Sequence, residues 1–218
     1  GILYASTGEG HSAKTIGIPG AGIFKSTDSG VSWTQLPSTA NSNFWWVNKL
    51  AINPNNGNHL LAVTSDINKD ATSYGSEFDD GGKLYESFDG GTNWTEVSLQ
   101  SNELTDVEFS PQNSNVRTVS GIGELFVYNS SSGQYESKMN QLNNYPGRVE
   151  VAMASNNANV MYALVNTKVQ SNAPDSSTYA AIYKSTDSGQ NWSYQSIQDS
   201  IFTSTSFGDY SNTIWVDP

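Results

Sequence analysis

The stretch KSTDSGVSW, from Lys25 to Trp33, recurs almost unchanged as KSTDSGQNW, from Lys184 to Trp192. A third copy, ESFDGGTNW, runs from Glu86 to Trp94, so the chain repeats the pattern S-x-D-x-G-x-x-W. A weaker copy, NSSSGQYE, occupies residues 129–136, where a further repeat is due. Self-similarity at such intervals is typical of repeat architectures, in which each repeat is one structural unit.

A second periodic feature is an alternating apolar run, a turn rich in Asn, Ser, Pro and Gly, and another apolar run. It occurs at residues 50–63, 107–119 and 151–164. This pattern is typical of a β-hairpin. The last residues, NTIWVDP, match its first half, and ILYAST near the start matches its second half. Equivalent points in the repeats are separated by 57, 44 and 63 residues, at Pro54, Pro111, Ser155 and Pro218.

The two features together predict a repeat of four strands. Strands A and B form the hairpin, strand C precedes the S-x-D-x-G-x-x-W turn, and strand D follows it. Four-stranded units at this spacing indicate propeller blades, and no window shows the 3.6-residue apolar period of a helical solenoid. We therefore predict an all-β fold, a β-propeller of four-stranded antiparallel blades.

The predicted divisions treat the chain as one propeller domain or segment. Strands B, C and D of a first blade span residues 1–37, complete blades span 44–100, 103–145 and 146–198, and strand A of a next or closing blade spans 210–218. The chain is then either a closed four-bladed ring or a segment of a larger ring.

The repeated turn, called the box below, is interpreted as a structural element. Its aspartate can accept hydrogen bonds from turn amides, its glycine can adopt a positive φ, and its tryptophan can pack the turn against the blade. A catalytic or metal-binding role is the alternative, but function rarely recurs once per structural unit. The box residues are Asp28, Gly30 and Trp33, Asp89, Gly91 and Trp94, and Asp187, Gly189 and Trp192.

These boxes resemble the Asp-box, or BNR repeat, of sialidases, xyloglucanases and sortilin-type propellers. The lead-in at residues 4–30 is most similar to sortilin-type and bacterial secreted propellers. The resemblance implies the fold rather than an activity. It also implies that a sialidase would hold its substrate carboxylate with three arginines, whereas this chain has only Arg117 and Arg148. Xyloglucanases of this kind place one catalytic acid in each of two joined propellers.

The longest insertions fall in the B–C and D–A connections, on the face of a propeller opposite the boxes. They cover residues 6–22, 65–82, 166–179, 41–46 and 199–210. Insertions that gather on one face commonly mark the binding face. The predicted ligand-binding residues there are Trp45, Trp46, Phe202, Phe207, Tyr210 and His11. Strand alternation is expected to turn at least one of the two tryptophans into the core.

An acidic segment carries the clearest local motif of this loop face. Asp66, Asn68, Asp70 and Glu77 stand at positions 1, 3, 5 and 12 of a calcium loop. Ala71 replaces the glycine expected at position 6, so a calcium site and a solvated acidic loop are both open. For a glycoside hydrolase, the candidate catalytic acids are Glu9, Asp66, Asp79 and Asp80.

Composition narrows the classes of function. The formal net charge of −11 argues against nucleic acid as a partner and against binding to an anionic membrane. No apolar run is long enough to insert into a membrane, and motifs such as G-x-S-x-G and H-E-x-x-H are absent. We expect an extracellular or cell-surface, non-catalytic propeller that binds a glycan or polypeptide and packs against remaining blades of a larger chain. The alternatives are a glycoside hydrolase and a structural module of a large surface or secretion-cargo protein.

Overall fold

The computed structural model describes residues 1–8, 18–65, 82–101, 103–142, 146–168, 178–198 and 213–216. The chain divides into two compact units, Gly1–Val107 and Glu108–Pro218, and each is described by itself. Among the described residues, the only regular elements besides β-strands are three short 3-10 helices. The all-β prediction is confirmed.

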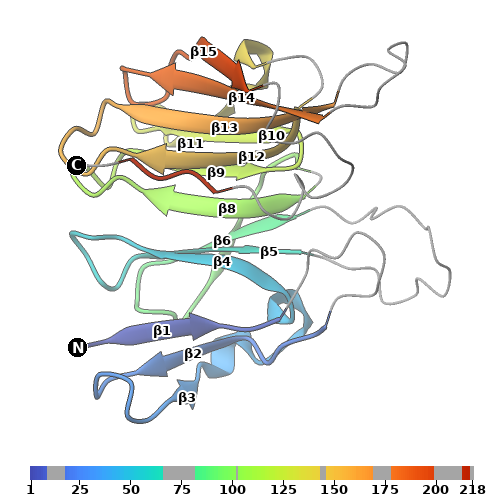
Figure 1. The fold of residues 1–218 in the computed structure, drawn as a ribbon. Coiled ribbons are helices and arrows are strands. Elements are labelled where there is room, and N and C mark those ends of the chain that lie inside the picture. The colour runs from blue at the N-terminus through green and yellow to red at the C-terminus, as the bar shows by residue number, and fades with distance from the viewer. Residues whose placement is uncertain are drawn as a thin grey trace, which may run out of the picture. The chain divides into compact units, whose positions relative to one another are not determined.

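Unit 1 contains a three-stranded and a four-stranded antiparallel sheet (Figure 1). The first has the order β1-β2-β3, with β1 (Leu3–Ser6), β2 (Ile23–Ser26) and β3 (Thr34–Gln35). The 3-10 helices η1 (Pro37–Thr39) and η2 (Ser42–Phe44) lead to the second sheet. Its order is β4-β5-β6-β7, with β4 (Val47–Ile52), β5 (Leu60–Thr64), β6 (Lys83–Ser87) and β7 (Thr95–Val97).

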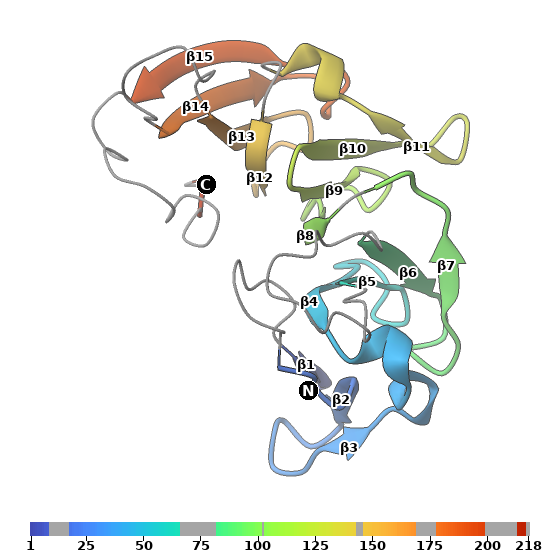
Figure 2. The ribbon, with the colours of Figure 1, turned by 90° about the vertical axis from the view of Figure 1, so that its right-hand side faces the viewer.

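Two further four-stranded sheets follow (Figure 2). The third joins β8 (Leu104–Phe109), β9 (Arg117–Gly121), β10 (Glu124–Asn129) and β11 (Gln134–Ser137), and β8 contains the boundary between the units. After η3 (Met139–Gln141), the fourth joins β12 (Pro146–Met153), β13 (Met161–Lys168), β14 (Thr178–Ser185) and β15 (Ser193–Gln198). In every sheet the strands lie in sequence order, so each sheet is an antiparallel meander, as the repeat predicts.

Burial explains why β5, the second strand of the second sheet, carries four successive apolar residues before Thr64. All five residues of β5 are buried, which requires a continuous hydrophobic run rather than an alternating one. Around it, the core of unit 1 gathers Ile23, Phe44, Val47, Ala62 and Tyr85. The core of unit 2 is built mainly from β12, β13, β14 and the indole of Trp192.

The hairpin turns and the boxes lie together, at the same end of each sheet. The N–H at box position 4 donates to a carbonyl of the A–B turn, from Gly90 to Asn58 at 2.9 Å and from Ser188 to Asn159 at 3.0 Å. In the first sheet, Ser29 donates in the same way to Gly1 at 3.1 Å. The boxes are thereby fastened to the adjoining hairpin of their own sheet.

The segment 213–216 differs from its expected form. The sequence predicts strand A of a further blade there, but these residues pair with no strand in the described part of the chain. A β-strand forms only when a neighbouring strand satisfies its backbone N–H and C=O groups. Trp215 is accordingly 77% exposed.

Candidate functional site

The three boxes share one hydrogen-bond pattern, which decides whether their aspartates are available for chemistry. In the third box, the Ser185 hydroxyl donates to Asp187 Oδ1 at 2.8 Å and accepts the Gly189 N–H at 2.9 Å. Asp187 also accepts from the backbone N–H and the side-chain Nδ2 of Asn191, at 2.8 and 2.7 Å. The other two boxes repeat these four contacts at distances of 2.6–2.9 Å.

The backbone of each box turns left-handed at two successive positions. Gly30, Gly91 and Gly189 have φ values of 93°, 86° and 81°, which glycine adopts without a steric penalty. The preceding residue is also left-handed, with φ of 61° at Ser29 and 59° at Ser188. Reasoning from the sequence missed this position, although a glycine at its equivalent in the second copy, Gly90, was a usable signal.

The tryptophans fold back over their own turns. The indole N–H of Trp192 donates to the Gly189 carbonyl at 2.9 Å, and that of Trp33 donates to Gly30 at 3.1 Å. Trp192 is 8% exposed, and Trp94 is half-buried with its ring 5.5 Å from that of Phe44. These contacts fit the predicted packing role.

Trp33 departs from that role, because 42% of its surface is exposed. The other two indoles are covered by the connection that leads into their own sheet. Phe44 of η2 packs on Trp94, and Gln141 of η3 accepts the backbone N–H of Trp192 at 2.8 Å. Among the described residues no comparable segment covers the indole of Trp33, and its ring keeps an exposed face.

The weak fourth box is closed by different side chains. Asn129 replaces the serine, Ser131 the aspartate and Glu136 the tryptophan. Asn129 Oδ1 accepts the Ser131 N–H at 2.9 Å, and its Nδ2 donates to Glu136 Oε1 at 2.6 Å. This turn is therefore held by an Asn–Glu pair in place of the Ser–Asp pair.

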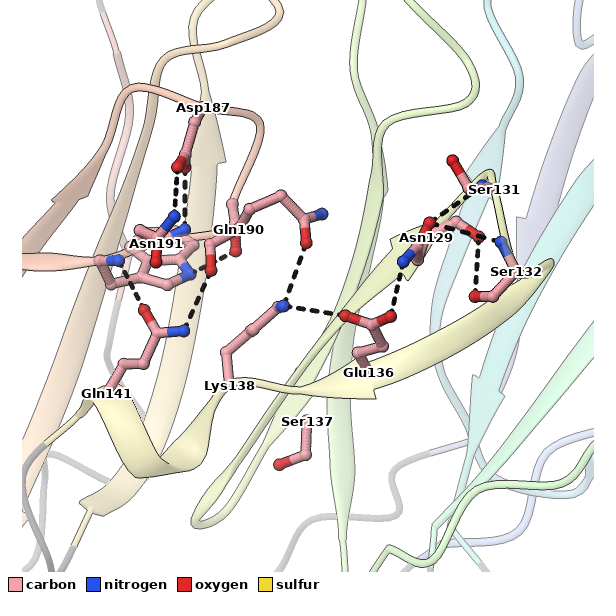
Figure 3. A network of polar contacts seen from close by, with 12 residues as sticks. Asn129, Ser131, Ser132, Glu136, Ser137, Lys138, Gln141, Asp187, Gln190 and Asn191 are labelled. Carbon is pink, nitrogen blue, oxygen red and sulfur yellow. Dashed lines mark hydrogen bonds and ion pairs between the residues drawn. The ribbon is translucent and has the colours of Figure 1, made fainter.

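A buried lysine joins this weak box to the third box, as Figure 3 shows. Lys138 Nζ lies 3.0 Å from Glu136 Oε2 and donates to Gln190 Oε1 at 3.1 Å. Gln141 Nε2 donates to the Gln190 carbonyl at 3.0 Å. The polar groups of this network link neighbouring sheets of unit 2.

The hydrogen bonds keep the box carboxylates ionised. The side chain and backbone N–H of Ser32 lower the pKa of Asp28 to about 2, and the backbone and side chain of Asn93 lower that of Asp89. For Asp187, burial raises the pKa, but hydrogen bonds from Asn191 and Ser185 outweigh it and the net pKa is lowered. Groups with such pKa values serve as fixed acceptors and are poor general acids near neutral pH.

We predict that stability falls with acidification through the range in which these groups titrate. A carboxyl whose pKa is lower in the folded state binds fewer protons there, so its contribution is fully present well above the ordinary aspartate pKa of 3.8 and is lost as pH falls through the lowered folded-state pKa. Urea unfolding between pH 6 and pH 2 measures this slope. Asp187→Asn should flatten it, since an amide does not titrate. An unchanged slope in the variant would show that Asp187 does not contribute.

The two arginines are engaged within the fold. Arg117 is buried, with its guanidinium carbon 3.7 Å from the ring centroid of Tyr128. Arg148 holds Glu150 Oε1 through Nε at 2.6 Å and through its terminal nitrogen at 2.5 Å. Neither geometry matches a guanidinium presented to a substrate carboxylate, so this chain does not form the three-arginine clamp of a sialidase.

His59 belongs to the interior of the box end. Its Nε2 lies 2.7 Å from Glu86 Oε1, and its Nδ1 lies 2.9 Å from Asn53 Nδ2. The exposed ring of Phe88 stacks on the imidazole, with centroids 4.5 Å apart. The histidine is thus a satisfied internal group that ties β6 to the A–B turn.

On the loop face, the side chains of the adjacent Trp45 and Trp46 lie in different environments. Trp46 is 4% exposed and belongs to the core, so the prediction that it binds a ligand is wrong for this structure. Trp45 is half-buried, and its carbonyl accepts the Gly20 N–H at 2.6 Å. Neighbouring residues leave the backbone in opposite directions near a strand, which sends one ring inward and leaves the other at the surface.

Polar groups surround the start of β4, beside Trp45. Asn48 Nδ2 donates to Ser65 Oγ at 2.8 Å and to the Leu104 carbonyl at 2.7 Å. The next residue, Lys49, lies 3.1 Å from the buried carboxylate of Asp106 and keeps 46% of its side chain exposed. We call Trp45, Asn48 and Lys49 the loop-face rim. Trp45 contributes an aromatic ring and Lys49 a partly exposed ammonium, while Asn48 donates both of its side-chain hydrogens within the fold.

The remaining predicted site residues lie outside the described residues. They are Glu9, His11, Asp66, Asn68, Asp70, Glu77, Asp79, Asp80, Phe202, Phe207 and Tyr210. Within the described ranges, no three acidic or histidine side chains gather in a group that could hold a metal ion. The calcium site at residues 66–77 therefore stays a prediction. None of the described helices is long and apolar enough to cross a membrane.

Comparison with known proteins identifies the fold. No protein-family model matches the chain, and no curated protein sequence matches it. Among solved structures, it is similar to a GH74 enzyme from Niastella koreensis, with a TM-score of 0.58 and 19% identity over 88% of this chain. It is also similar to the GH74 xyloglucanase from Xanthomonas campestris, with a TM-score of 0.60 and 16% identity over 89% of this chain.

A third similar structure is YCF48 bound to D1 peptide, with a TM-score of 0.50 and 20% identity over 88% of this chain. The chain spans 51% of that protein and only 27% and 28% of the two enzymes. At these identities the similarity shows the fold alone. The antiparallel four-stranded sheets and these matches together show a β-propeller fold, and the partial coverage of the matched chains is consistent with a propeller segment.

Proposed function

We propose that this propeller is a non-catalytic, extracellular or cell-surface module that binds a glycan or polypeptide through its loop face. The observation that carries the proposal is the full engagement of the box carboxylates. Asp28, Asp89 and Asp187 each hold their own turn, with lowered pKa values. The box end is thus committed to the fold, and the loop face is where recognition is expected.

The loop-face rim supports this proposal. The half-buried ring of Trp45 suits stacking on a sugar ring or on an apolar peptide side chain. The partly exposed ammonium of Lys49, already oriented by Asp106, adds a donor for hydroxyl or carbonyl oxygens. Similar folds are found with both kinds of partner, since YCF48 was solved with a peptide and a GH74 relative is a xyloglucanase.

Binding to glycan and peptide arrays tests the proposal. We expect Trp45→Ala to weaken the best ligand about tenfold or more, because an aromatic anchor at an interface commonly contributes over 1 kcal/mol. Phe88→Ala is the matched control, since Phe88 is an exposed aromatic on the box end. Equal binding by both variants and the parent protein would overturn the assignment of the loop face, and selective loss in Phe88→Ala would move the site to the box end.

A glycoside hydrolase is the second candidate, and the similarity to two GH74 enzymes favours it. Its acids would come from Glu9, Asp66, Asp79 and Asp80. This candidate predicts hydrolysis of some polysaccharide that is abolished by one carboxylate-to-amide change. Absence of hydrolysis across a broad polysaccharide panel, in a protein that still binds a glycan, would favour the binding module.

A further inference from the structure

The A–B turns of the last three sheets share one conformation. In each, an asparagine side-chain oxygen accepts the N–H two residues ahead, and its carbonyl accepts the N–H three residues ahead. For Asn56 these distances are 3.1 and 2.9 Å, for Asn113 they are 3.0 and 2.8 Å, and for Asn157 they are both 3.0 Å. All three asparagines are exposed at the surface.

The residue that follows the asparagine is where the turns differ. Gly57 follows Asn56, Ser114 follows Asn113, and Ala158 follows Asn157. Gly57 is exposed, and a Cβ placed there would meet no atom within 4 Å. The three turns therefore form a natural comparison, in which the geometry is held constant and the steric bulk beside the asparagine changes.

We propose that Asn56 is a site of spontaneous covalent modification, by deamidation through a cyclic imide with Gly57. The backbone nitrogen of Gly57 loses its proton and attacks the side-chain Cγ of Asn56. A C–N bond forms, the Cγ–Nδ2 bond breaks, and ammonia leaves. Water then adds to either carbonyl of the ring and opens it, so Asn and water yield aspartate or isoaspartate and ammonia.

Two features of the turn promote this reaction. The Asn58 N–H donates to Asn56 Oδ1, the atom on which negative charge develops when the nitrogen attacks, and a donor placed there stabilises the oxyanion. Glycine has no Cβ, so its nitrogen can approach Cγ through backbone conformations that serine or alanine disfavour. Only the second feature is particular to Asn56 among the three turns.

The other aspartate or asparagine that precedes a glycine in the described chain is Asp89, before Gly90. Its carboxylate accepts hydrogen bonds from Asn93 and Ser87, which lower its pKa and keep it ionised. An ionised carboxylate is a poor electrophile, and its oxygens are fixed in the box. We therefore expect Asp89 to resist the equivalent reaction.

The modification changes the A–B turn that is hydrogen-bonded to the box of the second sheet. Isoaspartate lengthens the backbone by one methylene and adds a negative charge in the turn whose Asn58 carbonyl accepts the Gly90 N–H at 2.9 Å. The same turn positions His59 against Glu86. Conversion of Asn56 to isoaspartate should weaken these contacts and lower the stability of unit 1.

Peptide mapping by mass spectrometry after incubation in mildly alkaline H2-18O tests the proposal. The peptide with Asn56 should gain the mass that separates acid from amide, with one heavy oxygen, well before those with Asn113 and Asn157. Gly57→Ala should slow this conversion to the level of the other two turns. Conversion of Asn56 no faster than Asn113, or an undiminished rate in Gly57→Ala, would overturn the proposal.

Thermal unfolding of the same incubated samples tests the structural consequence. The parent protein should lose Tm in step with the converted fraction, while Gly57→Ala retains its Tm. Full conversion without a change in Tm would show that the A–B turn does not support the box of this sheet.

Discussion

Replacement of Trp192 by alanine is expected to destabilise the protein by about 3–5 kcal/mol, the range for truncating a buried aromatic side chain. The indole is 8% exposed, lies in the core of unit 2 and donates to the carbonyl of Gly189. Its loss removes packing area and releases the turn that it covers. Urea unfolding monitored by far-UV circular dichroism measures the change.

The matched control for this variant is Trp33→Ala. Trp33 occupies the same position of the first box and donates to Gly30, but it is 42% exposed. Its truncation should therefore have a clearly smaller effect, nearer to 1 kcal/mol on the scale of partly exposed side chains. If both variants lost the same stability, burial of the indole would not be what the box contributes.

Replacement of Gly22 by alanine is expected to have an effect of similar size, about 3 kcal/mol or more, because two penalties act on one residue. Gly22 has φ of 86°, which strains any residue with a Cβ. The added Cβ would also overlap with the backbone carbonyl oxygen of Thr39, which is fixed by the hydrogen bonds around η1. Unfolding in urea and the yield of folded protein report this effect.

Gly57→Ala serves as the control for the glycine prediction. Gly57 does not have a positive φ, and a Cβ there meets no atom within 4 Å. This substitution should change stability by no more than a few tenths of a kcal/mol. A Gly22→Ala variant as stable as Gly57→Ala would mean that the contact between β2 and η1 relaxes freely, contrary to the geometry described.

The repeat made the architecture predictable from the sequence. Each S-x-D-x-G-x-x-W stretch is a local turn whose chemistry depends on residues at most seven positions apart, so the roles of the aspartate and glycine follow from turn rules. The hydroxyl of Ser185, which links Asp187 to Gly189, was present in the pattern but was given no role. Its function becomes evident only when the turn is closed.

Contacts between distant segments could not be predicted in this way. The weak box relies on Lys138 and Gln190, which lie 52 residues apart. The exposure of Trp33 and the burial of Trp46 depend on which segments pack against each ring, which the local sequence does not specify. For the candidate site, the sequence directed attention to Trp45, whereas Asn48 and Lys49 emerged only from their side-chain contacts with Leu104 and Asp106 of β8.

Amide hydrogen exchange at the boxes tests the central claim, which is that the repeated turns are held by internal hydrogen bonds and stabilise the fold. The amides of Gly30, Gly91 and Gly189 donate to the serine hydroxyls at 2.8, 2.9 and 2.9 Å, although they stand in turns at the sheet ends. We predict protection close to that of the flanking strands. Exchange of these three amides at the rate of an unstructured turn would contradict the account.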